Sequence, residues 1–141
     1  MKPTQIYFLC TGNSCRSQIA EGLAQDLFKE QAKIYSAGLF AYGVNPMAIK
    51  ILKEVGIDIS HNESKEIDPV ILHSSDYVIT LCDHARDQCP VIPKSVRHIH
   101  WSIVDPAGAS GTTEQVMSLF RSVRDDIKQR LLDFKTETTK K

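Results

Sequence analysis

The sequence has no excess charge, no long apolar run and no recognisable targeting segment. Its 141 residues carry 17 Lys+Arg and 17 Asp+Glu, so the formal net charge is zero. This balance argues against a nucleic-acid or anionic-membrane partner, because such proteins usually carry a basic excess. No run approaches the ~18 apolar residues of a membrane span, and Met1 to Gln5 lacks the features of a signal peptide. We therefore expect a cytoplasmic protein that binds any anion by a local site.

What remains is the composition of an ordinary globular domain, with 42% hydrophobic and 24% charged residues. The length predicts one domain, and no linker or repeat divides the chain. We expect a domain over residues 1–135 and a flexible C-terminal tail over 136–141. In a reducing compartment, cysteines more often serve catalysis or metal binding than static disulfides. There are four of them: Cys10, Cys15, Cys82 and Cys89.

Strand patterns alternate with helix patterns along the chain. A short apolar run predicts a strand over residues 6–9, and we also expect strands over 34–37, 77–81 and 96–100. Helical spacing and capping residues predict helices over 17–28, 46–55 and 112–134, and a short one near 71–72. This order is typical of an α/β domain, here with a four-stranded parallel sheet and helices on both faces. Ligands of such sheets bind at the carboxyl ends of the strands, where both Cys10 and Cys82 fall.

The segment CTGNSCRS, residues 10–17, places a thiol and a guanidinium at the two ends of a loop that runs into a helix. A helix N-terminus and a nearby Arg lower the pKa of a cysteine thiol and favour the nucleophilic thiolate. Loop amides and the planar fork of Arg16 suit a tetrahedral oxyanion, and Gly12 permits close backbone approach. The pattern indicates nucleophilic attack by Cys10 on a bound oxyanion.

This loop resembles that of the low-molecular-weight protein tyrosine phosphatases and of the arsenate reductases that share their fold. Further similarity to the thioredoxin-coupled arsenate reductases covers nearly the whole chain, in the segments YSAG, VNP, VGIDIS, VITLC, CP, HW and DPAG. The resemblance implies a single-domain phosphatase-like fold and reduction of arsenate to arsenite for detoxification, with thioredoxin as the reductant. It also implies no tightly bound cofactor, and we expect a monomer.

The extra cysteines separate a reductase from a phosphatase, which needs only one. Reduction of arsenate requires two electrons, so a second thiol, Cys82, must attack Cys10 after the arsenic adduct forms. Cys89 would then attack Cys82 and free Cys10 by ordinary thiol–disulfide exchange. If residues 83–88 are helical, a rise of ~1.5 Å per residue separates Cys82 from Cys89 by ~10 Å. A disulfide needs Cα atoms within ~7 Å, so this segment must unwind on oxidation.

The resemblance also assigns roles to other residues. Asp105 would protonate the departing oxygen, Ser17 would stabilise the Cys10 thiolate, and we expect the Cys15 side chain to serve packing. Binding of the oxyanion falls to the loop residues Thr11, Gly12, Asn13, Ser14, Cys15 and Arg16.

One position departs from the family pattern. Some of these reductases share a potassium site built from Asn13, Glu21, Ser36 and an Asp where this chain has Lys65. A positive side chain is a poor cation ligand, so the Lys65 position makes a potassium site doubtful. We hypothesise that its ammonium replaces the ion and supports Asn13 and Glu21 directly.

Two other functions stay open at this point. The chain could be a tyrosine phosphatase whose extra cysteines protect the nucleophile from overoxidation. It could also be a zinc-binding or redox-sensing interaction module, although Cys82, His84 and Cys89 lack a second pair of ligands at a recognised spacing.

Overall fold

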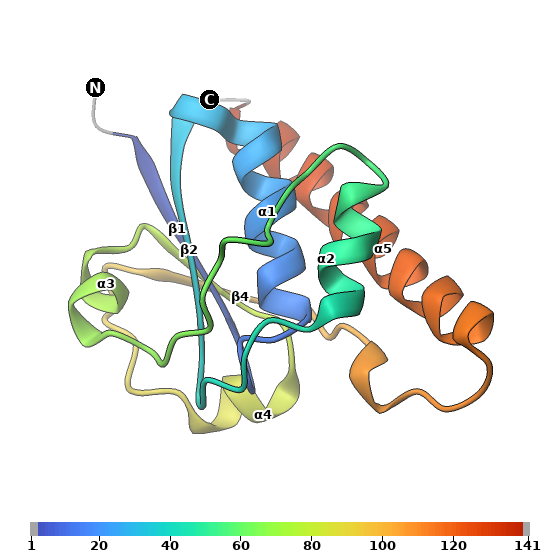
Figure 1. Cartoon of the computed structure of the whole chain (residues 1–141). Coiled ribbons are helices and arrows are strands. Elements are labelled where there is room, and N and C mark those ends of the chain that lie inside the picture. The colour runs from blue at the N-terminus through green and yellow to red at the C-terminus, as the bar shows by residue number, and fades with distance from the viewer. Residues whose placement is uncertain (1–2, 140–141) are drawn as a thin grey trace.

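The computed structural model describes residues 3–139, with a four-stranded parallel sheet at the centre. The strand order is β2-β1-β3-β4, so β1 is paired on both edges (Figure 1). This confirms the sheet expected from the sequence. The strands are β1 (Thr4–Cys10), β2 (Ala32–Gly38), β3 (Tyr77–Thr80) and β4 (Arg97–His100).

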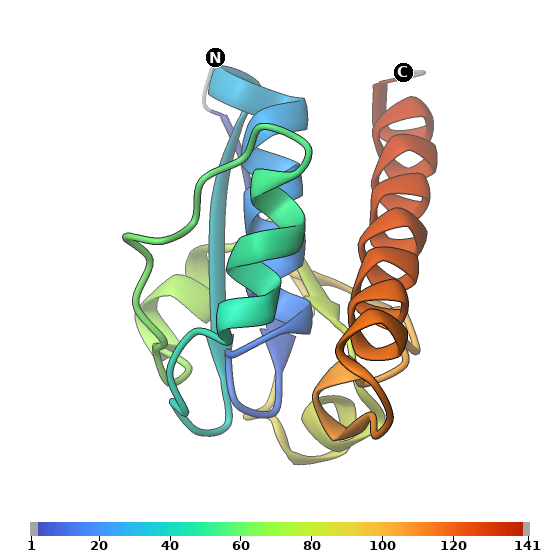
Figure 2. The ribbon, with the colours of Figure 1, turned by 45° about the vertical axis from the view of Figure 1, so that its right-hand side comes forward.

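Helices cover both faces of this sheet. The helices α1, α2 and α5 lie together on one face, and α3 and α4 lie on the other (Figures 1 and 2). Two short 3₁₀ turns, η1 (Lys29–Gln31) and η2 (Pro106–Gly108), precede β2 and α5. The helices are α1 (Arg16–Phe28), α2 (Pro46–Lys53), α3 (Pro69–Ser74), α4 (Asp83–Gln88) and α5 (Thr113–Thr139).

Local capping signals explain where the helices begin. The Asn45 side chain accepts a hydrogen bond from the backbone of Met47 and precedes a proline at the first helical position of α2. Asp68 does the same for α3. At the start of α5, Thr112 and Gln115 exchange side-chain and backbone hydrogen bonds in a capping box. These short-range interactions confirm the predicted starts.

The core is built on β1, because that strand is covered on both faces. Its residues Ile6, Phe8 and Leu9 are completely buried. The apolar stripe of α5 packs toward the sheet through Phe120, Val123, Ile127 and Leu131, as expected from its helical spacing. Burial of this kind stabilises a fold by roughly 25 cal/mol per Å² of apolar surface. The core therefore holds the carboxyl end of β1 in a fixed place.

The tail expected from residue 136 is wrong in part, because α5 continues through Thr139. Thr136 and Thr138 donate hydroxyl hydrogen bonds to the carbonyls of Leu132 and Phe134, one turn back. The polar composition of residues 136–139 favoured a flexible tail, but their backbone continues the helix. Residues 140–141 lie outside the described residues. Within residues 3–139, no helix is long and apolar enough to cross a membrane.

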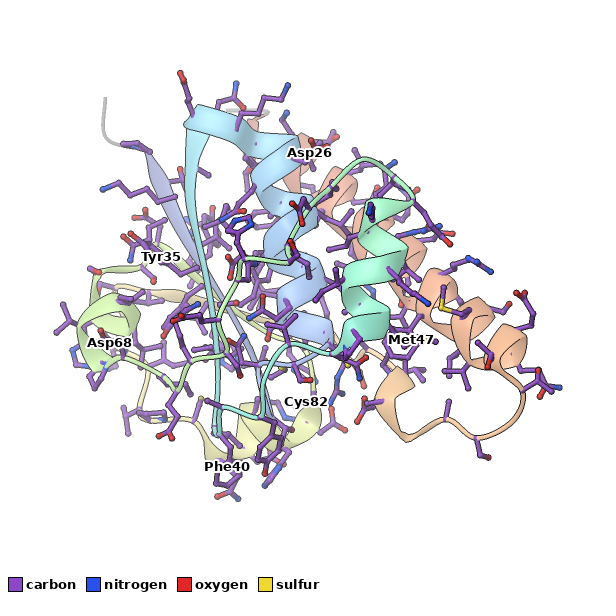
Figure 3. The ribbon with its side chains drawn as sticks, in the orientation of Figure 1. Asp26, Tyr35, Phe40, Met47, Asp68 and Cys82 are labelled. Carbon is purple, nitrogen blue, oxygen red and sulfur yellow. The ribbon has the colours of Figure 1, made fainter. Side chains whose placement is uncertain are left out.

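The carboxyl ends of the strands form one edge of the sheet, and the chain reverses its winding direction there between β1 and β3. Cys82 and Phe40 lie at this edge, whereas Asp26 lies at the opposite end of the molecule (Figure 3). Open α/β sheets bind ligands outside the strand ends at such a switch point. The topology therefore directs attention to the β1–α1 loop and to the residues that follow β2 and β3.

An ion-pair cluster at Glu54 ties the end of α2 to α5, and it gives a pH-dependent prediction. Hydrogen bonds from Arg121 and Arg124 lower the pKa of Glu54 from 4.5 to about 2. A lowered folded-state pKa adds stability above the unfolded value, and this is lost as the pH falls through the folded value. We expect Glu54→Gln to lower the thermal midpoint at pH 7 and the difference from wild type to shrink from pH 4.5 toward pH 2.

The matched control is Glu66→Gln, since Glu66 is exposed and forms no ion pair within residues 3–139. Thermal unfolding of the three proteins is followed by circular dichroism. A deficit in Glu54→Gln that is equally large at pH 2 and pH 7 would contradict this assignment.

Candidate active site

The loop between β1 and α1 forms the floor of the candidate site. Cys10 is the last residue of β1, and α1 begins at Arg16. Asn13 has a φ of 48°, a left-handed conformation that Asn tolerates better than most residues. The carbonyl of Cys15 accepts the first helical hydrogen bond, from Ile19. The loop therefore turns sharply and its backbone joins the N-terminus of a helix.

The segment that follows β2 holds this loop from outside. The backbone amides of Leu39, Phe40 and Tyr42 donate to the carbonyls of Cys10, Thr11 and Gly12 at 3.2, 2.9 and 3.0 Å. Because loop carbonyls are occupied on this side, the loop is held as a rigid arc. Gly38 permits the contact, since a Cβ there would lie 2.6 Å from the backbone nitrogen of Asn13.

A buried polar network supports the loop from inside, with Asn13 at its centre. The Asn13 amide nitrogen donates to the Ser17 and Ser36 hydroxyls at 2.7 and 2.9 Å. Ser36 in turn donates to Glu21, which is buried. The Asn13 amide oxygen accepts from the Gln18 side chain and from the Lys65 backbone. Every hydrogen-bonding position of the Asn13 side chain is therefore used.

Ser17 connects this network to Cys10. Its hydroxyl oxygen lies 2.8 Å from the Cys10 sulfur, and both residues are buried. Because the Ser17 oxygen already accepts from Asn13, its own proton is available to donate to sulfur. Ser17 thus lies against the sulfur that it is expected to stabilise, and this role stays a prediction.

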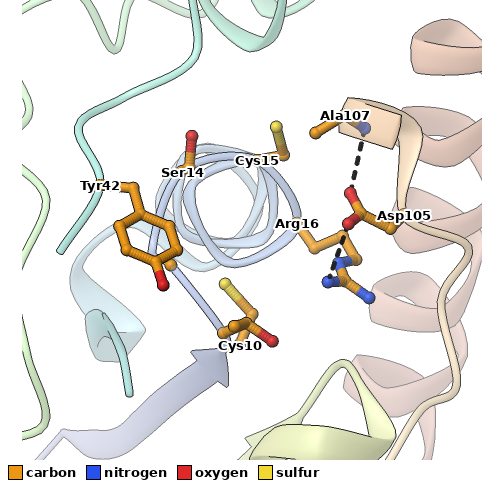
Figure 4. A pocket seen from close by; sticks show the side chains of 9 residues that line it. Cys10, Ser14, Cys15, Arg16, Tyr42, Asp105 and Ala107 are labelled. Carbon is orange, nitrogen blue, oxygen red and sulfur yellow. Dashed lines mark hydrogen bonds and ion pairs between the residues drawn. The ribbon is translucent and has the colours of Figure 1, made fainter. Parts of the chain in front are cut away.

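Above the loop lies a pocket of about 160 Å³ (Figure 4). Arg16 enters it, 11% exposed, with its guanidinium 3.6 Å from an Asp105 carboxylate oxygen and donating to the Ile103 carbonyl. The other Asp105 oxygen accepts from the backbone of Ala107. The pocket is lined by Cys10, Thr11, Gly12, Ser14, Cys15, Arg16, Tyr42, Asp105 and Ala107.

The pocket places a sulfur, a guanidinium and a carboxyl group around one small volume. Cys10 and Arg16 lie at opposite ends of the loop, and Asp105 is far from both in the sequence. The fold brings the three together at the pocket, as expected. Tyr42 was missed by sequence reasoning, although an aromatic residue in a glycine-containing loop after β2 is a usable signal. Its ring lies over Gly12, where a Cβ would come within 2.4 Å of a ring carbon.

Cys15 differs from Cys10 although both line the pocket. It is 4% exposed, and burial, the largest effect, raises the pKa of its thiol to about 11. The nearby charge of Asp105 acts in the same direction. Cys15 therefore stays protonated near neutral pH, which agrees with the packing role expected for it.

The two remaining thiols lie at the two ends of α4. Cys82 is buried, and its sulfur lies 3.2 Å from the Thr11 hydroxyl of the loop and accepts from the Ala85 backbone at 3.3 Å. It thereby caps the N-terminus of α4. Cys89 follows the last residue of α4 and is half-buried, and burial raises the pKa of its thiol. All four cysteines are free. Residues 83–88 are helical, so the condition for the expected separation of Cys82 and Cys89 is met.

The hypothesis for Lys65 is wrong in its geometry. The Lys65 ammonium donates to the carbonyl of Glu63 at 2.8 Å, and within residues 3–139 no ion pair joins it to Glu21. Asn13 is supported by the backbone amide of Lys65. The residues also do not fit a potassium ion, because N–H donors already occupy both acceptor positions of the Asn13 oxygen. In the same described part of the chain, no group of three or more His, Cys, Asp or Glu side chains gathers as a metal site.

Comparisons with known proteins agree with this geometry. Residues 5–141 match the family model described as low molecular weight phosphotyrosine protein phosphatase. An arsenate reductase of Bacillus subtilis is 54% identical over 129 residues, covering 92% of this chain and 93% of its own length.

Two solved structures extend the comparison. An arsenate reductase in the phosphate binding state is 33% identical and covers 95% of this chain and 98% of its own, with a TM-score of 0.78. A thioredoxin-dependent arsenate reductase of Corynebacterium glutamicum is 25% identical and has a TM-score of 0.68. It covers 92% of this chain and 62% of its own.

The contact at Gly38 gives a prediction for the loop. In Gly38→Ala, the new methyl group meets backbone atoms of Asn13, Phe40 and Thr11 at 2.6 to 2.8 Å, and backbone cannot move aside cheaply. We expect a loss of about 1 to 3 kcal/mol of stability, typical of overpacking, together with weaker binding of inorganic phosphate. Urea unfolding and titration calorimetry measure the two effects.

Gly108→Ala is the control, since a Cβ at Gly108 meets nothing within 4 Å. Unchanged phosphate affinity in Gly38→Ala would show that this contact does not shape the anion site.

Proposed function

Because the chain belongs to the low molecular weight phosphotyrosine protein phosphatase family, we propose that it turns the family's thiolate chemistry on arsenate and reduces it to arsenite. The observation that carries the proposal is the approach of a second thiol to the nucleophile loop. Cys82 contacts Thr11, the residue directly after Cys10, from the neighbouring strand. Hydrolysis of a phosphoester has no use for this thiol, whereas a two-electron reduction requires it. The relatives named arsenate reductase support the same conclusion.

In the first step, the Cys10 thiolate attacks arsenic and an arsenic–oxygen bond breaks. Arg16 and the loop amides bind the remaining oxygens. The Asp105 carboxylate takes a proton from the bound hydrogen arsenate and passes it to the departing oxygen, which leaves as water. Asp105 is suited to this role because its carboxyl group lies beside the guanidinium that holds the anion. Ser17 stabilises Cys10 as the thiolate before attack. Arsenic is still in the +5 state in the resulting adduct.

In the second step, the Cys82 sulfur attacks the Cys10 sulfur and releases its proton to water. A sulfur–sulfur bond forms, the arsenic–sulfur bond breaks, and its electron pair leaves with arsenic as arsenite. The backbone N–H of Ala85 donates to the Cys82 sulfur and holds it at the start of α4, beside the loop that carries Cys10. The two sulfurs are oxidised by two electrons in total, which balances the reduction of arsenic from +5 to +3.

In the third step, Cys89 attacks Cys82, and the Cys10 thiolate leaves. The oxidation is thereby moved to a Cys82–Cys89 disulfide, away from the pocket. Helix α4 separates these residues and must unwind for the bond to form. We propose that a dithiol protein of the thioredoxin type then reduces this disulfide, a proposal supported by the thioredoxin-dependent relative. Such thiol chemistry suits the reducing cytoplasm.

The proposed reaction uses no resident cofactor, and one chain supplies every residue, so we infer that the protein acts as a monomer. We also propose that potassium is not needed, since Asn13 is fully hydrogen bonded without it. Replacing sodium by potassium at constant ionic strength should leave the thermal midpoint and KM for arsenate unchanged. In Lys65→Asp, which introduces an oxygen ligand, a potassium effect should appear. A clear potassium effect in the wild type would contradict this.

The main test follows arsenate turnover coupled to thioredoxin, thioredoxin reductase and NADPH. We expect Cys10→Ser and Cys82→Ser to lose turnover. Cys82→Ser should keep slow hydrolysis of an aryl phosphate, because Cys10, Arg16 and Asp105 remain. Cys89→Ser should release about one arsenite per enzyme and then stop, with Cys10 and Cys82 joined. Cys15→Ser is the matched control, and we expect it to keep turnover.

Turnover supported only by glutathione and glutaredoxin, and indifferent to Cys89, would contradict the relay. The second candidate is a tyrosine phosphatase, favoured by the exposed Tyr42 ring at the pocket, against which an aromatic substrate could stack. Rapid hydrolysis of aryl phosphate by a wild type that lacks arsenate turnover would support it.

A further inference from the structure

A chain of polar side chains runs across the sheet edge to the first residue of α4. The buried Thr80 hydroxyl of β3 lies 2.9 Å from Nε2 of His98 and 2.7 Å from Nδ1 of His100, both on β4. The other ring nitrogen of His100, Nε2, lies 2.8 Å from an Asp83 carboxylate oxygen. Asp83 directly follows Cys82 and begins α4. None of these four residues has a part in the reaction steps above.

The proton positions along this chain are determined by chemistry. A carboxylate only accepts hydrogen bonds, so Nε2 of His100 carries a proton and donates to Asp83. In the neutral imidazole, Nδ1 then has no proton and accepts from the Thr80 hydroxyl. The Thr80 oxygen accepts in turn from Nε2 of His98. Each donor meets an acceptor, and the three hydrogen bonds all run from His98 toward Asp83 at the start of α4.

Side-chain charges agree with this arrangement. The hydrogen bond from His100 is the largest effect that lowers the pKa of Asp83, so its carboxyl group stays ionised. Burial is the largest effect that lowers the pKa of His98, and the charge of Arg86 acts in the same direction. His98 donates to Thr80 from Nε2 in this arrangement, so its hydrogen bond runs in the same direction as the others.

Helix α4 depends on side-chain contacts with the rest of the fold because it is too short to be stable alone. It has six residues, and isolated helices shorter than ~12 residues are marginal in water. Its one buried side chain is Ala85. Its first turn is held by the Cys82 cap and by Asp83, which also lies 3.5 Å from the Ser102 hydroxyl. When the Cys82 sulfur is drawn into a disulfide with Cys89, it leaves this cap, and the side-chain hydrogen bonds of Asp83 are what still holds the first turn.

We propose that Asp83 and His100 form a latch that sets how easily α4 unwinds, and that they act as positioning residues for Cys82 and Cys89. The proposal rests on the cysteine relay of the proposed function. The latch stabilises the helical state, in which the two thiols are held apart. It therefore opposes the Cys82–Cys89 disulfide until thiol exchange drives the unwinding.

The test measures the equilibrium of this disulfide in the full chain. A Cys10→Ser/Cys15→Ser background leaves Cys82 and Cys89 as the only thiols. Mixtures of reduced and oxidised dithiothreitol exchange two electrons and two protons with them, and alkylation followed by mass spectrometry counts the thiols. We expect Asp83→Asn, which removes the charge of the acceptor, and His100→Gln, which replaces the ring, each to weaken this bond and to raise the equilibrium constant for the disulfide about three- to tenfold.

Three controls separate the latch from general damage. Asp87→Asn removes a carboxylate from the same helix. Among residues 3–139, the ion pair of Asp87 is with the adjacent Arg86, so this variant should leave the equilibrium constant unchanged. The effect of the Asp83→Asn/His100→Gln double variant should be smaller than the sum of the two single effects, because the variants share the bond between these two side chains, although Asp83 also pairs with Arg86 and His100 also bonds to Thr80. Urea unfolding of the reduced proteins should give similar midpoints, while amide hydrogen exchange over residues 83–88 quickens in the variants at Asp83 and His100.

The possible outcomes distinguish the proposed latch from the cysteine relay on which it rests. A background protein that forms no Cys82–Cys89 disulfide at any dithiothreitol ratio overturns the relay itself. A disulfide that forms with the same equilibrium constant in wild-type background, Asp83→Asn and His100→Gln overturns the latch alone. Fully additive effects in the double variant would also overturn it.

Discussion

The parallel pairing of β1 with β3 is the constraint on which the site depends. It places Leu9 beside Thr80, so the chain leaves both strands at the same edge, where Thr11 and Cys82 come into contact. Pairing of β1 with β2 on its other side brings Gly38 beside Cys10. One central strand therefore positions the nucleophile, the second thiol and the segment after β2 that holds the nucleophile loop. No single local motif could do this, because the three segments are far apart in sequence.

Much of the fold follows from short-range signals. Strands β1 and β3 contain apolar runs, whereas β4 is Arg-His-Ile-His, and the starts of α2, α3 and α5 are marked by side chains that bind the next few backbone amides. Such signals act within one turn and can be recognised in a sequence. The end of α5 could not, since its polar residues 136–139 continue a helix whose stability comes from the preceding turns.

The site shows the same division. The loop from Cys10 to Ser17 is local, so its nucleophile, guanidinium and hydroxyl could be recognised together. The place of Tyr42 depends on how the segment after β2 runs along the loop. The partners of His100 depend on strand pairing and on the direction of two side chains. The Lys65 ammonium binds the Glu63 carbonyl, whereas its residue type alone suggested support of Asn13 and Glu21.

Four identical side chains acquire four different environments in this fold. Cys10 meets a hydroxyl proton, Cys15 is enclosed and protonated, Cys82 caps a helix, and Cys89 lies half-buried at the end of that helix. Their reactivity differs because the surroundings differ, and a count of cysteines says little about which of them reacts.

The pairing of Arg16 with Asp105 has a kinetic meaning as well. A lone guanidinium in a pocket would project a positive field, but here a carboxylate 3.6 Å away balances it, on a protein with no net charge. Such a molecule has little means of steering anions through water from beyond the Debye length of about 8 Å at physiological salt. Capture then begins at random collision, and the choice among oxyanions is made after contact, by fit to the loop and by what the sulfur can do to the central atom.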